Sequence, residues 1–415
     1  MKVGIIPSQL NGSIVAPQSK SYAHRLIICA YLSGERVKIE NVGESRDVFA
    51  TLNALKSLGL EYLIDNGDVT VWRGENNPKR VVVDCDESGS TMRFLLPIAC
   101  ALGKKCTFSG KQGLLNRPIE SLVKTLNENG ADITNLSVNG KLKSGTYLVD
   151  ATISSQYISG LLFALSILDG DSRLEFIGKP VSTNYLDITL DALRLFNIDI
   201  QKLENGYFVK GNQRYNCNKK QLVTEGDYSG SAFILCAGAI GGRVEVKGLN
   251  KNSFQGDREI LNVLKEFGAT VTIEDNSVTV GKDRLNGITY DCENIPDLVQ
   301  IISVVAAYSK GVTTLKNVQR LKIKESDRIT AIIEMLSASG VRVEYNGRDL
   351  IIYGGQPSSS NFDGGNDHRT VMSQCVLALY AKGNSTIVGA QAIKKSYPNF
   401  FNDVSLLGGK IDVNI

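Results

Sequence analysis

The stretch LNVLKEFGATV, residues 261–271, places a helical pattern, a glycine and a β-like run in direct succession. Leu261, Leu264 and Phe267 recur at the spacing of one helix face, and the apolar run that follows is rich in β-branched residues. Gly268 stands just past the helix, at the position where a left-handed backbone commonly ends one. The stretch therefore predicts an amphipathic helix that stops at Gly268 and continues into a strand.

The same arrangement occurs six times along the chain, so it is a structural repeat rather than an isolated motif. The six segments are residues 51–63, 122–133, 190–200, 261–271, 332–343 and 403–413, with punctuating residues Gly59, Gly130, Asn197, Gly268, Gly340 and Gly408. Successive punctuating residues are 71, 67, 71, 72 and 68 positions apart. The chain is therefore predicted to contain six units of about 70 residues each.

A second set of six helices alternates with the first and is apolar on nearly every side, which predicts burial. These helices lie within residues 23–34, 92–103, 158–170, 231–242, 299–311 and 371–383. Six units in 415 residues favour a three-plus-three division, because one core rarely grows so large. The polar stretch at 212–227 predicts the main seam, and a second crossing is expected near Gln18. A single solenoid of six units is the alternative, although polar capping repeats are not evident.

Composition narrows the functional class. Apolar residues make up 42% and charged residues 21% of the sequence, as in a globular protein, and the net charge of +3 does not by itself indicate nucleic acid binding. The absence of a long apolar run or a leader-like segment at the start predicts a cytoplasmic protein without a membrane partner. Eight cysteines without a C-x-x-C pair are interpreted as buried thiols, and two histidines are too few for a histidine-based metal site.

Charged and hydroxyl residues recur where both sets of helices begin. The buried helices end at Gly34, Gly103, Gly170, Gly241, Gly311 and Gly383. Fourteen positions before these glycines stand Lys20, Gly89, Gln156, Asp227, Asp297 and Arg369. The amphipathic helices are preceded at matched positions by Asp47, Arg117, Tyr185, Asp257, Arg328 and Lys395. Helix N-termini attract anions, and units of one topology point these ends the same way. We expect two domains to present them to a shared cleft. For any single residue, a cap or a solvated dipole partner is the simpler interpretation.

Two other phosphate-binding motifs are excluded by their chemistry. A P-loop requires a glycine directly before its lysine, and Ser19 occupies that position before Lys20. No G-x-G-x-x-G sequence follows a predicted strand, so a dinucleotide-binding fold is unsupported.

Ten motifs in order resemble the enolpyruvyl transferase family, and within it the 3-phosphoshikimate 1-carboxyvinyltransferases, or 5-enolpyruvylshikimate-3-phosphate (EPSP) synthases. The motifs are PQSKSYAHR, SGSTMRF, NRPI, SSQY, VSTNYLDIT, EGDYSGSAF, IPDL, KESDR, NDHR and SYPNFF. The resemblance implies two similar α/β domains, each made of three βαβαββ units in threefold pseudo-symmetry, an arrangement described as an inverse α/β barrel. The expected domains are residues 20–224, on the shikimate-3-phosphate side, and residues 1–19 with 225–415, with the active site in the cleft between them.

The resemblance also implies a reaction and roles. Phosphoenolpyruvate and shikimate-3-phosphate would form an enolpyruvyl ether and phosphate by addition and elimination, without metal or cofactor. Asp297 is the expected base on the 5-hydroxyl, Glu325 handles the proton at C3, and Lys20 assists the departing phosphate. Apart from the two small-molecule substrates no partner is expected, and the enzyme is expected to be a monomer.

Two sets of binding residues follow from the resemblance. Shikimate-3-phosphate would be held by Lys20, Ser21, Arg25, Ser154, Ser155, Gln156, Ser182, Tyr185, Asp297 and Lys324. Phosphoenolpyruvate would be held by Lys20, Gly89, Arg117, Gln156, Arg328, His368, Arg369 and Lys395. For His368 a capping or packing role is an equal alternative, and His24 is interpreted as structural.

The chain departs from the usual pattern of the family at Gln18, Glu87 and Arg320. At Glu87, an acidic group beside the expected anion site needs a partner or must point away. Two other functions stay open. A sister enzyme transfers enolpyruvate to UDP-N-acetylglucosamine, but its reactive cysteine has no counterpart in GKQGLLNRPIE, residues 110–120. A non-catalytic anion-binding scaffold would explain the basic helix starts but not Asp297 and Glu325 among them.

Overall fold

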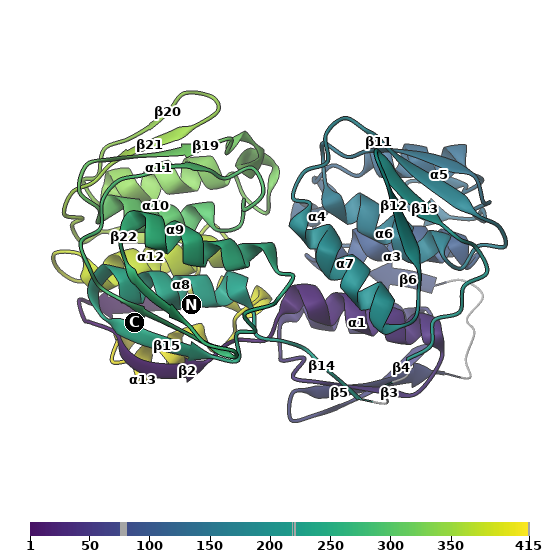
Figure 1. The fold of residues 1–415 in the computed structure, drawn as a ribbon, viewed down its shortest axis with the longest axis horizontal. Helices are drawn as coiled ribbons and strands as arrows, with labels where there is room; N and C mark the ends of the chain where they lie inside the picture. Colours follow the sequence, from purple (N-terminus) through teal and green to yellow (C-terminus); the bar gives the residue numbers. More distant parts are fainter. Residues whose placement is uncertain (75–80, 218, 220, 414–415) are drawn as a thin grey trace. The chain divides into compact units, whose positions relative to one another are not determined.

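The computed structural model describes residues 1–74, 81–217, 219 and 221–413. The chain divides into two compact units, one formed by Met1–Ser19 with Glu225–Ile415 and the other by Lys20–Thr224 (Figure 1). We call them the discontinuous unit and the continuous unit.

The continuous unit alternates helices with short strands. Its helices are α1 (Lys20–Ser33), α2 (Arg46–Ser57), α3 (Gly89–Ala101), α4 (Gln112–Leu115), α5 (Glu120–Glu128), α6 (Ser155–Leu165) and α7 (Asn184–Leu195). Its strands are β3 (Val37–Glu40), β4 (Leu60–Asp65), β5 (Asp68–Arg73), β6 (Val81–Asp84), β7 (Cys106–Ser109), β8 (Ile133–Thr134), β9 (Ser137–Val138), β10 (Thr146–Asp150), β11 (Ser172–Ile177), β12 (Ile200–Leu203), β13 (Gly206–Val209) and β14 (Gln221–Val223).

The discontinuous unit follows the same plan. Its α-helices are α8 (Tyr228–Gly241), α9 (Ile260–Phe267), α10 (Val299–Ala307), α11 (Arg328–Ala338), α12 (His368–Tyr380) and α13 (Phe400–Leu406), with 3₁₀ helices η1 (Gly256–Glu259), η2 (Gln319–Ile323) and η3 (Ala390–Lys395). Its strands are β1 (Lys2–Ile6), β2 (Asn11–Val15), β15 (Arg243–Lys247), β16 (Thr270–Ile273), β17 (Ser277–Gly281), β18 (Thr289–Asp291), β19 (Val312–Lys316), β20 (Val343–Tyr345), β21 (Leu350–Tyr353), β22 (Asn361–Asp363), β23 (Ser385–Val388) and β24 (Lys410–Asp412).

Every sheet of the described residues has four strands and one pairing pattern. In β6-β7-β9-β8, for example, β6 pairs parallel with β7, and the remaining pairs are antiparallel. The same order holds for β10-β11-β13-β12, β14-β3-β5-β4, β2-β15-β17-β16, β18-β19-β21-β20 and β22-β23-β1-β24. Six repeats of one βαβαββ topology, three in each unit, are therefore confirmed.

Strands exchanged along the chain complete three of these sheets. β14, at the end of the continuous unit, pairs with β3 near its beginning, and the N-terminal strands β1 and β2 join sheets built from residues after 225. The chain thus enters and leaves the continuous unit beside the bridge between Gln18 and Gly226. This exchange explains why the first nineteen residues belong with the C-terminal half.

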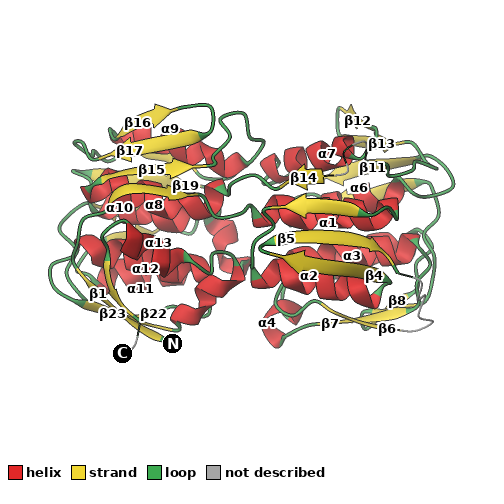
Figure 2. Ribbon diagram, turned by 90° about the horizontal axis from the view of Figure 1, so that it is seen from below, coloured by secondary structure: helices red, strands yellow, loops and turns green. Residues whose placement is uncertain are grey.

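Within each unit the helices fill the interior and the sheets lie outside them (Figure 2). α3 packs against α6 in the continuous unit, and α8, α10 and α12 pack together in the discontinuous unit. Each helix of these five is buried over nearly its whole length, as their all-round apolar sequences predict. The eight cysteines are free and buried, also as predicted.

The six punctuating residues all have the left-handed backbone that the repeat predicts, with φ between 58° at Asn197 and 103° at Gly59. One expectation needs correction. Asp257 and Lys395 do not lie in the first turn of an α-helix, because the short 3₁₀ helices η1 and η3 hold them before α9 and α13 begin. Arg117 does not either, because it lies in the segment between α4 and α5. The tighter 3₁₀ turn is common where a chain enters a helix.

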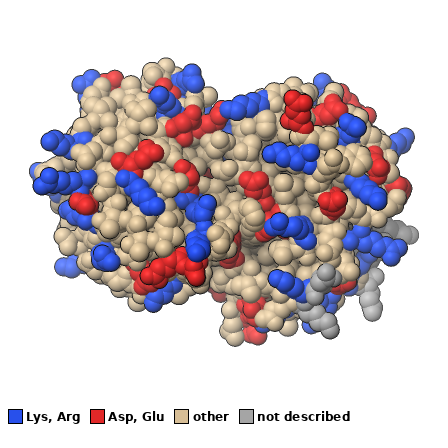
Figure 3. Space-filling model, in the orientation of Figure 1, with Lys and Arg blue, Asp and Glu red and all other residues tan. Residues whose placement is uncertain are grey.

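The surface and the helices agree with the composition. Basic and acidic side chains are intermixed on the face drawn in Figure 3, as the small net charge suggests. Among the helices of the described residues, none is both long and apolar enough to cross a bilayer.

Candidate active site

Arg328 is the centre of a buried charge cluster in the discontinuous unit. It is the first residue of α11, and its side chain is 2% exposed. Its Nη1 donates to Asp297 Oδ1 at 2.8 Å, and its Nε donates to Asp367 Oδ2 at 2.8 Å. Burial lowers the pKa of Arg328, but the carboxylates of Asp367 and Asp297 more than offset this and raise it above its usual value. The arginine is therefore a permanent cation at this position.

Asp297 has two further cations around it. Arg369 Nη2 donates to Asp297 Oδ2 at 3.2 Å, and Lys324 Nζ lies 3.7 Å from Asp297 Oδ1. Arg369 Nη1 also donates to the backbone carbonyl of Asp297 at 3.0 Å, which fixes the segment just before α10. The Asp297 side chain is 18% exposed, so the carboxylate still reaches solvent. A partly open carboxylate held by three cations can accept a proton from a bound hydroxyl.

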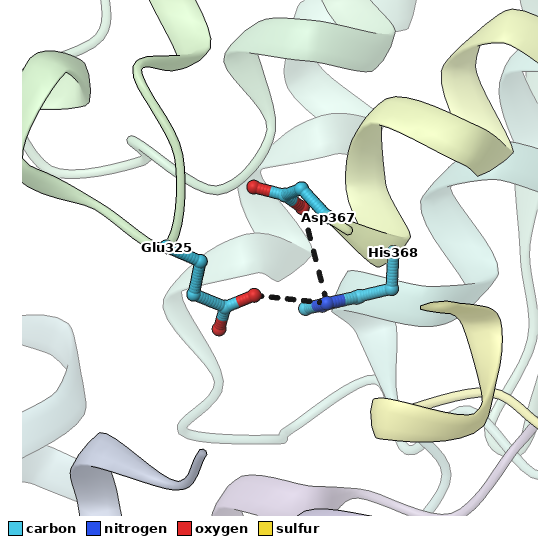
Figure 4. A group of neighbouring side chains, drawn as sticks. All are labelled: Glu325, Asp367 and His368. Atoms are coloured by element: carbon cyan, nitrogen blue, oxygen red, sulfur yellow. Dashed lines mark ion pairs between the residues drawn. The ribbon is translucent and has the colours of Figure 1, made fainter. Parts of the chain in front are cut away.

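Glu325 lies on the other side of Arg328, against His368. Its Oε2 is 3.1 Å from His368 Nδ1 and 3.8 Å from Arg328 Nη2 (Figure 4). The ring of His368 is 1% exposed and lies 3.9 Å from Asp367 Oδ1. Glu325, with its side chain 21% exposed, is thus an accessible acid whose neighbours are an imidazole and a guanidinium.

The group Glu325, Asp367 and His368 has the composition of a metal site, with one ligand atom of each residue within 4.8 Å of the others. Arg328 contacts both of its carboxylates, and a metal ion would have to displace that guanidinium or accept its repulsion. Burial raises the pKa of Asp367, and the charge of Arg328 outweighs it, so the pKa lies below its usual value. The arginine supplies the positive charge that the buried carboxylate requires, and the group is best explained as an ion-pair network.

Two more residues border this cluster. Lys395 is buried, and its Nζ donates to the carbonyl of Asn366, the residue directly before Asp367. Asp257 is 3% exposed and accepts a hydrogen bond from Ser229 Oγ. Burial and the nearby charge of Asp297 raise the pKa of Asp257 to about 6, against the opposing effect of Arg369.

The continuous unit gathers its own polar residues where its helices begin. Lys20, the first residue of α1, forms an ion pair with Asp47 of α2 at 2.8 Å. Gly89 opens α3 directly against Arg117, since a Cβ added at Gly89 would lie 2.7 Å from Arg117 Nη1. A lysine, an arginine and free N–H groups of a helix terminus are suited to bind a phosphate or a carboxylate.

Arg93 is a site residue that the sequence motifs did not single out. Its Nη1 donates to Gln156 Oε1 at 2.7 Å and its Nη2 to the carbonyl of Pro118 at 3.0 Å, next to Arg117. Gln156 Nε2 in turn donates to Ser90 Oγ at 2.9 Å. Arg93 is 6% exposed in an otherwise apolar helix, and that contrast is the signal by which it could have been found.

Arg25 joins the starts of α1 and α7. It donates to the carbonyls of Ser21 at 2.8 Å and Tyr185 at 3.1 Å, and burial lowers its pKa to about 10, so it stays charged at neutral pH. Ser182, just before α7, has a left-handed backbone with φ of 52°. At the start of α6, Ser154 is the N-cap and accepts from the N–H of Gln156, and Ser155 follows as the first helical residue. The hydroxyl residues therefore stand at helix N-termini.

Comparison with known proteins identifies this arrangement. The profile of EPSP synthase (3-phosphoshikimate 1-carboxyvinyltransferase) matches residues 5–404. The chain belongs to the EPSP synthase family. It is 39% identical to the 3-phosphoshikimate 1-carboxyvinyltransferase of Clostridium kluyveri and 39% identical to that of Clostridium acetobutylicum, each over 99% of this chain and 98% of the relative.

Solved structures agree on the fold. EPSP synthase from Acinetobacter baumannii superimposes with a TM-score of 0.83 at 23% identity, over 99% of both chains. The enolpyruvyl transferase NikO from Streptomyces tendae superimposes with a TM-score of 0.77 at 16% identity, over 99% of this chain and 98% of its own. The two-domain fold expected of an EPSP synthase is therefore confirmed.

The expected site residues occur in both units. In the discontinuous unit Arg328 contacts Asp297, Asp367 and Glu325, and Lys324, His368 and Arg369 contact the same carboxylates. In the continuous unit Lys20, Gly89, Arg117, Gln156 and Arg25 contact their neighbours at the starts of α1, α3, α6 and α7.

Glu87, one of the residues at which the chain departs from the usual pattern of the family, has a partner. Lys111 Nζ lies 3.1 Å from Glu87 Oε1 and 3.2 Å from Asp86 Oδ1, and Arg46 Nε donates to Asp86 at 2.6 Å. Glu87 therefore has the partner that an acidic group at this position was expected to need, because the charge of Lys111 offsets its own.

Proposed function

We propose that Asp297 and Glu325 are the proton-transferring residues of the reaction that this chain catalyses. That reaction is the transfer of the enolpyruvyl group from phosphoenolpyruvate to the 5-hydroxyl of shikimate-3-phosphate. The products are 5-enolpyruvylshikimate-3-phosphate and inorganic phosphate. The name and length of the matched family support this activity.

The substrates bring two phosphates and two carboxylates, so the site has to supply many positive charges. Lys20, Arg117, Arg328, Arg369 and Lys395 are proposed to bind phosphoenolpyruvate, together with Gly89, Gln156 and His368. Shikimate-3-phosphate is proposed to bind Ser21, Arg25, Ser154, Ser155, Gln156, Ser182 and Tyr185, with Lys20, Asp297 and Lys324 at its reacting end.

In the proposed addition step, the oxygen of the 5-hydroxyl bonds to C2 of phosphoenolpyruvate while Asp297 accepts the proton of that hydroxyl. Glu325 donates a proton to C3. In the elimination step Glu325 takes one C3 proton back, the C2–O bond to phosphate breaks, and Lys20 stabilises the leaving phosphate. General acid–base catalysis of this kind contributes about 10²–10⁴ in rate. The remaining acceleration is expected from fixed charges and positioning.

A single observation carries the assignment of roles. Arg328 contacts Asp297 at 2.8 Å and Glu325 at 3.8 Å, so two partly exposed carboxylates flank one buried cation. They are separate groups with different neighbours, a histidine for Glu325 and three cations for Asp297. Different surroundings allow one carboxyl to serve as base while the other serves as acid.

Phosphate release tests the activity. Purified protein is incubated with phosphoenolpyruvate alone, with shikimate-3-phosphate, and with UDP-N-acetylglucosamine. Release that depends on shikimate-3-phosphate supports the proposal. Release that depends on UDP-N-acetylglucosamine would support the sister reaction instead, and no release in any mixture would support an anion-binding scaffold. We also propose that the enzyme is a cytoplasmic monomer, which sedimentation and cell fractionation would check.

A further inference from the structure

A chain of buried hydroxyl groups joins the first three helices of the continuous unit. His24 Nδ1 of α1 lies 2.7 Å from Thr51 Oγ1 of α2, and Thr51 Oγ1 lies 2.6 Å from Thr91 Oγ1 of α3. Thr91 then donates to Ser88 Oγ at 2.7 Å. All four residues are at most 1% exposed. Ser88 is the N-cap of α3, so the chain ends directly before Gly89 and its contact with Arg117.

A second chain leads from α6 through α7 back to α1. Thr189 of α7 accepts from Arg25 Nε at 2.8 Å and lies 2.8 Å from Ser159 Oγ of α6. Its hydroxyl donates to the carbonyl of Tyr185 at 3.1 Å, so Ser159 is the donor of the other contact. Arg25 also binds the carbonyls of Ser21 and Tyr185. Thr189 thus holds the segment at which shikimate-3-phosphate is proposed to bind.

Arg93 and Gln156 close the ring between α3 and α6 at 2.7 Å. Consecutive contacts therefore run α1–α2–α3–α6–α7–α1, with His24 and Arg25 adjacent on α1. Each participating side chain comes from the first two turns of its helix. The ring lies within about two turns of the helix N-termini that carry the proposed substrate-binding residues.

The repeat shows that Thr51 and Thr189 are unusual for their position. Each stands eight residues before the punctuating residue of its repeat, Gly59 and Asn197. The matched positions of the other four repeats hold Leu122, Ile260, Ile332 and Phe400. A fully buried hydroxyl where the fold elsewhere uses an apolar side chain adds no packing advantage, and such exceptions are expected at functional sites.

The donor and acceptor in each hydrogen bond of the first series can be assigned by starting from Ser88. Because Thr91 donates to Ser88, it accepts from Thr51, and Thr51 accepts from the Nδ1–H of His24. His24 Nε2 has no hydrogen-bond partner in the described residues, so it is a bare acceptor. Burial, with Lys20 and Arg25 nearby, lowers the pKa of His24 well below its usual value, which keeps the ring neutral. The hydrogen bonds of this series therefore all point one way, from His24 to Ser88, the N-cap of α3.

We propose that this ring positions two anion subsites separately. Thr51 positions the subsite at Gly89 and Arg117, which binds phosphoenolpyruvate. Thr189 positions the subsite at Arg25 and Tyr185, which binds shikimate-3-phosphate. Thr51 and Thr189 are positioning residues that act through Ser88 and through Arg25. The inference rests on the proposed function and adds to it the division of the ring between the two substrates.

The test compares Thr51→Val and Thr189→Val, which keep the shape but remove the hydroxyl, with Thr51→Ser and Thr189→Ser, which keep it. Thr51→Val should raise the KM for phosphoenolpyruvate about fivefold or more and leave the KM for shikimate-3-phosphate within about twofold. Thr189→Val should do the reverse, and calorimetry with shikimate-3-phosphate alone should show its weaker binding. The serine variants should restore both values to within about twofold of the wild type.

Equal rises of both KM values in both valine variants would show that the ring only supports the fold, and would overturn the inference. Serine variants that behave like the valine variants would overturn it as well. Urea unfolding of all four proteins separates loss of folded protein from loss of binding. Failure of the wild-type protein to release phosphate would be seen before any variant is measured, and would reject the proposed function together with this inference.

Discussion

Arg328 and Asp367 form a buried ion pair, with Arg328 Nε 2.8 Å from Asp367 Oδ2 and side chains 2% and 0% exposed. They come from the starts of helices in neighbouring repeats, one at α11 and the other at the N-cap of α12. Asp367 contributes twice, because it caps α12 through the N–H of Arg369 and also neutralises the cation that contacts Asp297 and Glu325. The pair therefore connects the stability of the unit to the arrangement of its proposed catalytic carboxylates.

Replacing Asp367 by alanine should destabilise the protein by about 3–5 kcal/mol, because it leaves a buried guanidinium without its main partner. Urea unfolding would measure the loss. Glu344→Ala is a suitable control, since it breaks an exposed ion pair with Arg342 and should hardly move the midpoint. Similar midpoints for the two variants would show that Arg328 does not depend on Asp367.

Asp297→Ala and Glu325→Gln should lower kcat by about 10²–10⁴ while affecting substrate binding much less, because each removes one proton-transfer group. Steady-state phosphate release and calorimetry with shikimate-3-phosphate would separate turnover from binding. The exposed Asp275, which pairs with Lys251, provides a control variant, Asp275→Ala, that should retain activity. Full activity of Asp297→Ala would exclude it as the base.

Gly89→Ala should weaken phosphoenolpyruvate use about tenfold or more, since the new methyl group would lie 2.7 Å from Arg117 Nη1 and push the guanidinium away. The fold should survive, because the atom displaced is the end of a flexible side chain. Gly113→Ala, where a Cβ meets nothing within 4 Å, is the matched control. An unchanged KM for phosphoenolpyruvate in Gly89→Ala would remove Arg117 from the proposed binding site.

Lys20→Met should raise the KM for phosphoenolpyruvate and lower kcat together, because Lys20 is assigned both to binding and to the departing phosphate. The shape of the side chain is largely kept, so urea unfolding should show a folded protein. Lys251→Met removes a cation far along the sequence, at an exposed pair with Asp275, and should leave both constants unchanged. A Lys20→Met enzyme with normal kcat would confine Lys20 to substrate binding.

Asp257→Asn should stabilise the protein increasingly as the pH rises. In the native state burial and Asp297 raise the pKa of Asp257 to about 6, against an unfolded value of about 3.9. The native protein therefore binds the extra proton between these values, and the stability that this proton provides is present below about pH 4 and lost as the pH rises through about 6.

The asparagine variant does not titrate and keeps an acceptor for Ser229. Its stability relative to the wild type should therefore rise by about 2 kcal/mol between pH 4 and pH 7, since one pKa unit corresponds to about 1.4 kcal/mol. Urea unfolding at both pH values measures the difference. A difference that stays constant with pH would mean that Asp257 is already ionised in the acidic range.

Local pattern predicted the architecture well. The spacing of apolar residues and the glycine or asparagine after each helix located the six repeats, because both reflect the backbone of a few neighbouring residues. The residues at the helix starts were also found this way. There are three exceptions. Arg117 lies in the segment between α4 and α5, and Asp257 and Lys395 lie in 3₁₀ turns whose hydrogen bonding depends on how the preceding loop packs.

The side-chain contacts at the candidate site could not be predicted from the spacing of residues in the sequence. Arg93 and Asp367 were not recognised as site residues, since an arginine in an apolar helix and an N-cap aspartate each have an ordinary local explanation. The contact of Thr189 with Arg25 spans 164 positions, and the contact of Thr51 with Thr91 spans 40. In sequence these threonines occupy a helix face that periodicity alone assigns to the core.

By itself, the sequence determined how many repeats there are, at which glycine or asparagine the amphipathic helices end, and which charged groups stand near the helix starts, because these properties depend on residues close together in the chain. The tertiary structure decided which of the charges neutralise one another and which buried polar side chains link the helices into a ring. Such choices depend on distances of about 3 Å between side chains from different repeats, and only the packing of whole helices sets those distances.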